Sequence, residues 1–243
     1  SRMNQHELLD GLFEALRDGE DFEWDEILDY IQNIIDDDAF WEEEYSEFNY
    51  RDWIIARIAD IIEEKTRNDD NPFKMELLSK VSTVIIKLAG KSDSELYPMG
   101  DIVTSVLNSP KGKIYLAMLN FSLSYARLYR KDDEDKWYDS IKLCIEKKLD
   151  NPPVELLVVL AEYLRFICYI DKNWIIKNID KIFSDVYWEE TFTGYIIYHV
   201  NPFYEEIYKL VKNKGYYDKA IKTDFEDKEV VKSLVYQICS AYF

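Results

Sequence analysis

Residues 52–67 of this 243-residue chain read DWIIARIADIIEEKTR. The apolar residues in this stretch recur at the three- and four-residue spacing of one helix face, which predicts an amphipathic helix packed against a core. The predicted inward face consists of Trp53, Ile54, Ile58, Ile61 and Ile62.

The rest of the chain repeats this pattern with few residues that break helices. It has 7 glycines and 6 prolines, well below the average usage of about 7% and 5%. Short helices joined by tight polar turns stack as hairpins, so the sequence predicts an all-α fold, a helical-hairpin array of the HEAT- or armadillo-like α-solenoid type. The further predicted helices are 6–17, 25–36, 73–89, 100–107, 113–130, 136–148, 153–170, 171–183, 188–199, 202–212 and 227–242.

Charge divides the chain into two parts. The net charge is −18, and residues 1–70 carry 23 acidic and 6 basic side chains, whereas residues 71–243 carry 25 and 24. The run NDDNP at 68–72 is typical of a linker, because Asn and Asp favour turns and Pro closes the preceding helix. We therefore predict an acidic helical subdomain at 1–70 and a helical repeat-like domain at 71–243 that continues from it.

The acidic first third excludes one class of partner and favours another. Nucleic-acid binding needs clustered Lys and Arg to neutralise phosphates, so we expect no nucleic acid to bind this third. A basic protein surface would be attracted. Aromatic residues, which are enriched at protein interfaces, are interspersed with the acids over residues 22–53. The candidate partner-binding residues are Trp24, Asp36, Asp37, Asp38, Trp41, Glu42, Glu43 and Tyr45.

Residues that could carry chemistry are scarce. The two histidines, His6 and His199, are far apart in the sequence, and no His-x-x-x-His or Glu-x-x-His pair provides ligands for a helical metal site. We interpret His199 as a helix C-terminal residue, favoured there by the helix dipole. The acids at 36–38 and 42–44 do not follow the EF-hand loop, and consecutive acids on a helix point in different directions. We expect no catalytic residue, no metal and no cofactor.

Cysteine use and hydropathy predict a cytoplasmic protein without a membrane span. Cys144, Cys168 and Cys239 are odd in number and lie among apolar neighbours, which predicts reduced thiols in the core. The first residues follow an acidic helical pattern that differs from a signal peptide. The most apolar stretch, 154–170, contains three charged residues and is too short to cross a bilayer.

Several segments in the second half resemble a known family. They are NSPKGKIYLAML at 108–119, AEYL at 161–164, IDKNWI at 170–175, NI at 178–179, IF at 182–183, VNPFYEEIY at 200–208 and YDKAI at 217–221. In this order, over about residues 105–222, they are similar to the helical C-terminal regions of large bacterial antiphage defence proteins of the sirtuin-like and STAND ATPase types.

The resemblance implies a HEAT-like helical module that senses a phage component or builds the oligomer, while an effector domain elsewhere does the chemistry. Its motifs are packing motifs: Asp171 matches a helix cap, and Trp174 and Phe183 match inward-facing residues. Ser184 stands where the family pattern has proline, and the acidic first third has no counterpart.

The sequence therefore favours a non-catalytic protein-recognition or scaffolding module, as the sensor or oligomerisation part of a bacterial antiphage defence protein. The expected partners are a protein with a basic surface, such as a phage protein, an effector domain, or a second copy of the chain. Two alternatives stay open. One is a carboxylate-dependent, metal-assisted hydrolase whose acids meet only in the tertiary structure, and the other is a plain oligomerisation domain.

Overall fold

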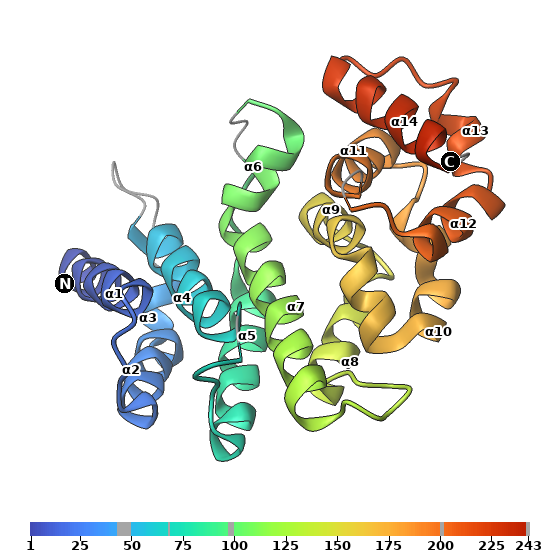
Figure 1. Ribbon diagram of the computed structural model, residues 1–243. Coiled ribbons are helices and arrows are strands. Elements are labelled where there is room, and N and C mark those ends of the chain that lie inside the picture. Colours follow the sequence, from blue (N-terminus) through green and yellow to red (C-terminus); the bar gives the residue numbers. More distant parts are fainter. Residues whose placement is uncertain (43–49, 68, 97–99, 200–201, 242–243) are drawn as a thin grey trace. The chain divides into compact units, whose positions relative to one another are not determined.

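The computed structural model describes residues 1–42, 50–67, 69–96, 100–199 and 202–241. The described residues form fourteen α-helices and one 3-10 helix and contain no strand (Figure 1). The predicted all-α fold is confirmed. The chain divides into two compact units, one made of Ser1–Tyr97 and Asn108–Ile145, the other of Pro98–Leu107 and Glu146–Phe243. We call them unit 1 and unit 2.

Unit 1 contains the acidic first third together with later helices. Its elements are α1 (Arg2–Arg17), α2 (Trp24–Asp36), α3 (Asp38–Trp41), α4 (Tyr50–Arg67), the 3-10 helix η1 (Met75–Leu77), α5 (Leu78–Lys91), α7 (Pro110–Tyr129) and the first part of α8 (Asp139–Lys148). The predicted linker at 68–72 lies inside this unit, between α4 and η1. Beside it, Arg127 of α7 donates hydrogen bonds of 2.7 and 2.8 Å to the two carboxylate oxygens of Asp69.

Helix α4 is the centre of unit 1, because it packs along α7 and along α1 (Figure 1). The four isoleucines of its predicted inward face, Ile54, Ile58, Ile61 and Ile62, are fully buried. The prediction was wrong for Trp53, whose side chain is 45% exposed. Adjacent helical residues point about 100° apart, so Ile54 takes the inward position and Trp53 lies at the rim. Its ring centroid is 5.5 Å from that of His6.

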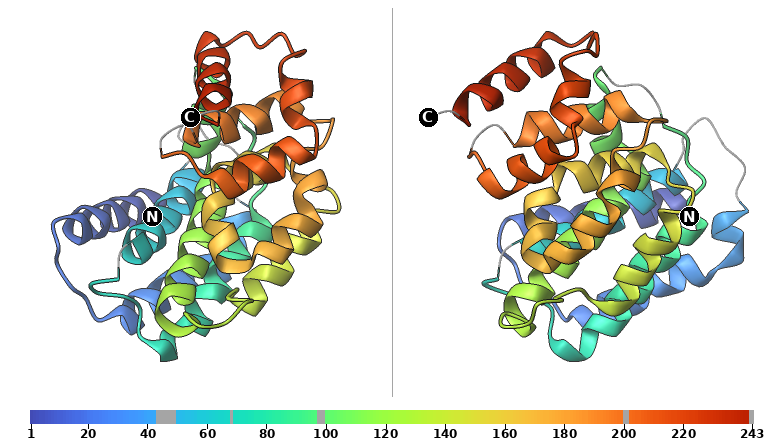
Figure 2. Two further views of the ribbon diagram at one scale, coloured as in Figure 1. Left: turned by 45° about the vertical axis from the view of Figure 1, so that its right-hand side comes forward. Right: turned by 90° about the vertical axis from the view of Figure 1, so that its right-hand side faces the viewer.

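Unit 2 consists of helices in which α11 packs on α9 and α14, while α10 packs on α9 and α12. Its elements are α6 (Ile102–Asn108, except the last residue), α9 (Val154–Glu162), α10 (Leu164–Ile182), α11 (Trp188–Tyr198), α12 (Glu205–Asn213), α13 (Tyr216–Ala220), α14 (Lys228–Ser240) and the end of α8. Helix α9 lies beside α11 (Figure 2), and α14 covers another side of α11.

The helix boundaries near Asp171 differ from the predicted ones. A single helix was expected at 153–170, but α9 ends at Glu162 and Tyr163 separates it from α10. Within α10, Asp171 is non-helical, with φ −161° and ψ 97°, and its carboxylate accepts the backbone N–H of Trp174 at 2.9 Å. The predicted cap at Asp171 and the inward positions of Trp174 and Phe183 are confirmed, since both rings are buried.

Two further expectations concern cysteines and membranes. The three cysteines are free, but only Cys144 and Cys168 are half-buried, and Cys239 is exposed on α14. The predicted core position is therefore wrong for Cys239. No helix of the described ranges is long and apolar enough to cross a membrane.

A close approach of two helix backbones fixes the packing of unit 2. A Cβ atom at Gly194 of α11 would lie 3.0 Å from Val158 Cγ1 and 3.1 Å from Val158 O on α9. The second contact is with backbone, which cannot rotate away. A larger residue at position 194 would therefore require α9 and α11 to move slightly apart.

We predict that Gly194→Ala lowers the free energy of unfolding by about 1–3 kcal/mol, because the added methyl overpacks this contact. The matched control is Gly11→Ala in the middle of α1, where nothing lies within 4 Å of the added Cβ. This control should gain about 0.5–1 kcal/mol from helix propensity. Urea unfolding measures both, and a stabilised Gly194→Ala variant would contradict the packing described.

His199 follows the last residue of α11, as predicted, and its side chain is buried. Its Nδ1 lies 2.8 Å from the carbonyl oxygen of Tyr195. Because a carbonyl only accepts, Nδ1 carries the proton, and Nε2 of the neutral ring is an acceptor. Burial, with a smaller contribution from the positive charge of Arg165, lowers the pKa of His199 to about 4.

This lowered pKa predicts a loss of stability in mild acid. Above pH 6.5 His199 is neutral in both the folded and the unfolded chain. Between pH 6.5 and 4 the unfolded chain binds a proton at His199 that the folded chain does not. The free energy of unfolding should fall by about 3 kcal/mol over this range through His199 alone. Urea unfolding at several pH values should show a shallower decline for His199→Gln than for the unmodified chain. Parallel declines would contradict the assignment.

Candidate functional site

The predicted partner-binding residues do not form one surface. Glu43 and Tyr45 lie outside the described residues. Trp24 is the first residue of α2, whereas Asp36 is its last. A helix of 13 residues is about 20 Å long, so the two groups lie at opposite ends of α2.

At the C-terminal end of α2, cations of the same unit neutralise the three predicted aspartates. Asp36 pairs with Lys87. Asp37 lies 3.5 Å from the guanidinium of Arg2, and Asp38 lies 3.7 Å from the ammonium of Lys91. All three aspartates are exposed, yet they present little net charge to a partner.

Trp41 is held by groups of the chain itself. Its indole N–H donates to the carbonyl oxygen of Ile35 at 2.7 Å, and its own carbonyl oxygen accepts from Arg51 at 3.0 Å. Its ring packs edge-on against Phe40 at 4.9 Å. Glu42 follows it and is exposed. These contacts explain Trp41 as a packing residue at the end of α3.

Aspartates elsewhere on α2 and on α4 are also paired with cations, because the lysines of α5 and α7 lie in the same unit. Lys80 of α5 pairs with Asp25 at 2.8 Å and with Asp29. Lys113 of α7 contacts both carboxylate oxygens of Asp60 at 2.7 Å. The charge balance of residues 1–70 therefore overstates the negative field around them.

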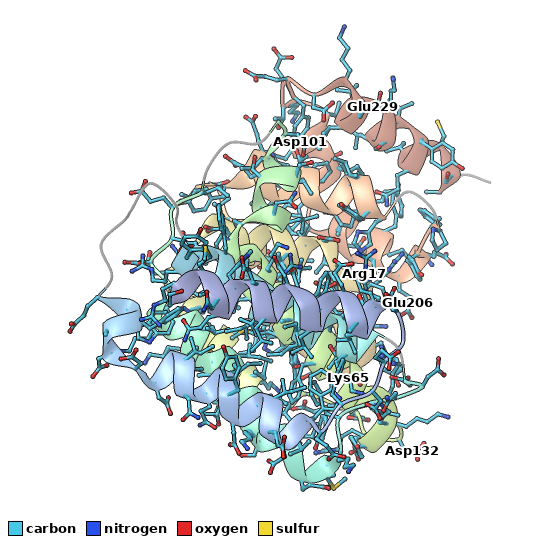
Figure 3. The ribbon with its side chains drawn as sticks, turned by 90° about the vertical axis from the view of Figure 1, so that its left-hand side faces the viewer. Arg17, Lys65, Asp101, Asp132, Glu206 and Glu229 are labelled. Carbon is cyan, nitrogen blue, oxygen red and sulfur yellow. The ribbon has the colours of Figure 1, made fainter. Side chains whose placement is uncertain are left out.

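Unpaired negative charge remains at the other end of α2, around the turn from α1. Residues 18–26 read DGEDFEWDE, with six acids and no basic residue. Four of these acids are exposed and form no ion pair with any residue that the structure describes. They are Asp18, Glu20, Glu23 and Glu26. In Figure 3, Arg17 and Lys65 mark this end of α1 and α4.

This turn borders a hollow of about 450 Å³ in unit 1, which we call the acidic hollow. Its lining residues are Asp21, Phe22, Glu23, Trp24, Asp25, Asn71, Pro72, Lys74, Glu76 and Leu77. The buried Trp24 ring meets the Phe73 ring edge-on at 5.0 Å. Aromatic walls with a carboxylate rim suit a cationic group on an aliphatic stem.

A buried lysine fixes the loop at the edge of the acidic hollow. The ammonium of Lys65 lies 3.4 Å from Asp21 Oδ1 and 5.0 Å from the centre of the Trp24 ring. Burial lowers the pKa of Lys65. A hydrogen bond from the Asn71 side chain, with others from the Phe22 backbone and Lys65, lowers the pKa of Asp21 to about 2. Asp21 therefore stays ionised and anchored above mild acid pH.

Sequence reasoning found Trp24 but missed the acids that accompany it. The signal was present in the run at 18–26, because it contains six acids without an intervening cation. The prediction instead chose the three consecutive aspartates at 36–38, which lie at the other end of α2. Their pairing with α1 and α5 depends on contacts between residues 35 to 53 positions apart in the sequence, which local patterns do not reveal.

No metal centre accompanies this site in the part of the chain that the structure describes. There, no group of three or more His, Cys, Asp and Glu side chains is arranged to hold an ion. The metal-assisted hydrolase alternative thus has no candidate site among these residues.

Comparison of the chain with protein-family models, with curated proteins and with solved structures gave no match. The resemblance over residues 105–222 to antiphage defence proteins stays a prediction.

Proposed function

We propose that this chain is a non-catalytic protein-recognition module that binds a basic protein surface at the acidic hollow of unit 1. One observation carries the proposal. The acids of α2 and α4 named above are paired with cations of the same unit, whereas the four at the α1–α2 turn are exposed and unpaired, beside a hollow with aromatic walls. Such a surface steers a cationic partner and then holds it in a partly dry site.

We further propose that the helices form a HEAT-like array and that the module is the sensor or oligomerisation part of a bacterial antiphage defence protein in the cytoplasm. Support comes from the resemblance over residues 105–222. The burial of Trp174 and Phe183 and the cap at Asp171 agree with the packing roles that the resemblance implies.

We predict that Glu20→Gln, Glu23→Gln and Glu26→Gln together weaken binding of a decalysine peptide about tenfold at low salt. Each exposed pair contributes about 0.5 kcal/mol, and about 1.4 kcal/mol corresponds to a factor of ten. Isothermal titration calorimetry measures the affinity, and added salt should weaken it.

The matched control is the triple variant Asp36→Asn, Asp37→Asn and Asp38→Asn, which changes net charge by the same amount. It should lower the affinity less than about threefold, because these aspartates are already paired. Equal losses in the two triple variants would mean that decalysine senses only total charge, and the assignment to the acidic hollow would be wrong.

A further inference from the structure

One arginine of unit 2 has no acceptor for its N–H groups. Every other arginine of the chain pairs with a carboxylate. Arg165 on α10 forms no ion pair and no hydrogen bond with any described residue, and its Nε–H is buried. An N–H group removed from water without an acceptor costs free energy, so native structures rarely leave one unused. The unused donors of Arg165 therefore point to an acceptor that a ligand supplies.

Arg165 lines a hollow of about 380 Å³ that is formed by α10 and the start of α12. These two helices pack against each other (Figure 1). Aromatic and apolar side chains form much of the wall, among them Tyr169, Phe203 and Tyr204. The guanidinium carbon of Arg165 lies 5.2 Å from the centre of the Tyr204 ring and 4.4 Å from that of Phe166. Contacts of a cation with rings at these distances hold the arginine at the wall of the hollow.

The first turn of α12 supplies further free donors to the same hollow. No side chain caps this helix, and its first backbone hydrogen bond is donated by Tyr208 to the carbonyl oxygen of Tyr204 at 2.9 Å. The backbone N–H groups of residues 205–207 therefore bond no described acceptor. All three residues line the hollow. Free N–H groups at a helix start favour an anion, and so does the unpaired charge of Arg165.

Two glutamates also line the hollow, but each is paired with a lysine of the same unit. Glu205 lies 2.6 Å from the ammonium of Lys209, and Glu206 lies 3.2 Å from that of Lys172. Neither glutamate pairs with Arg165, so the positive charge of the arginine stays available. The two glutamates still limit the charge of a ligand, because they repel a doubly charged phosphate more strongly than a single carboxylate.

The composition of the wall favours a protein as the source of that carboxylate. Tyr169 and Tyr204 are 41% and 38% exposed. Tyrosine and arginine together are typical of the residues that dominate binding at protein interfaces. The planar guanidinium can donate two parallel hydrogen bonds to one carboxylate. An acidic side chain with an apolar neighbour satisfies both the arginine and the aromatic wall.

We propose that this hollow, the Arg165 hollow, binds an aspartate or glutamate side chain of a partner protein. The carboxylate accepts hydrogen bonds from the guanidinium of Arg165 and from the N–H groups at the start of α12. An apolar residue beside the carboxylate packs on Tyr169 and Phe203. The Arg165 hollow shares no residue with the acidic hollow of unit 1 and takes a ligand of opposite charge, so this inference does not depend on the function proposed above.

The test uses the full chain and the peptide Ac-Ala-Leu-Glu-Leu-Ala-NH2, followed by two-dimensional NMR of the ¹⁵N-labelled protein. We expect saturable shifts at amides of 165–169 and 203–207. The matched peptide with glutamine in place of the glutamate keeps the shape and removes the charge. It should bind about tenfold more weakly, as expected for lost charge-assisted hydrogen bonds. Equal affinity of the two peptides, or absence of shifts at these amides, overturns the proposal.

Two variants separate binding from folding. Arg165→Gln removes the charge and should weaken binding of the glutamate peptide about tenfold. Arg165→Lys keeps the charge but loses the paired N–H groups, and should weaken it about threefold. The glutamine peptide should bind both variants and the unmodified chain equally, which a change of fold would not preserve. Unchanged affinity for the glutamate peptide in both variants contradicts the assignment.

The matched control is Lys177→Gln, which removes one positive charge from an exposed lysine of the same helix. It should leave the affinity for the glutamate peptide unchanged, because Lys177 does not line the hollow. A loss equal to that of Arg165→Gln would mean that the peptide senses only net charge, and the proposal would be wrong. The Glu20, Glu23 and Glu26 triple variant should also bind this peptide unchanged, which separates failure here from failure of the function proposed for unit 1.

Two further ligands identify the source of the carboxylate. The glutamine peptide with a free C-terminus has its only carboxylate at the chain end, and sodium acetate has one without a chain. Both should bind the Arg165 hollow more weakly than the glutamate peptide. Equal or tighter binding of the free C-terminus would overturn an acidic side chain in favour of a chain terminus. The same result with acetate would overturn a protein partner in favour of a small carboxylate.

Discussion

The burial of α4 between α1 and α7 is the constraint on which unit 1 depends. The isoleucines of α4 are buried where it packs against α1 and α7. Apolar burial of this kind is the main favourable term in folding. The same packing places later helices next to the acidic first third. Lys113 of α7 thereby reaches Asp60, and Lys87 of α5 reaches Asp36. Hydrophobic packing thus decides which carboxylates are neutralised and which stay available at the surface.

Local pattern was enough to predict the helices and several of their ends. Asp171 caps the helical turn that follows it, as expected. Helix α7 begins at Pro110, three residues before the predicted start, and Ser109 caps it by accepting the Gly112 N–H at 3.0 Å. Periodicity assigned the isoleucines of α4 correctly but misplaced Trp53, because a rim position and an inward one differ by one residue. The break at Tyr163 has neither Gly nor Pro to signal it. The candidate site was harder to predict, since net charge at Asp36 depends on a lysine 51 positions away.

The acidic hollow of unit 1 shows how a chain rich in acids can retain a specific negative site. The acidic hollow of unit 1 contains Lys74 and acids already engaged with Lys65 and Lys80, whereas Glu23 of its lining forms no ion pair with a described residue. This hollow joins carboxylates to apolar walls, a combination suited to binding cationic side chains.

The central claim is that unpaired carboxylates, and not total acidity, determine where a basic partner binds. The most direct measurement is a residue-by-residue NMR titration of the ¹⁵N-labelled chain with decalysine at moderate salt. We predict that perturbed amides cluster at 18–26 and 71–77 in unit 1. Perturbations centred on the paired aspartates at 36–38, or spread evenly over all exposed acids, would contradict the claim.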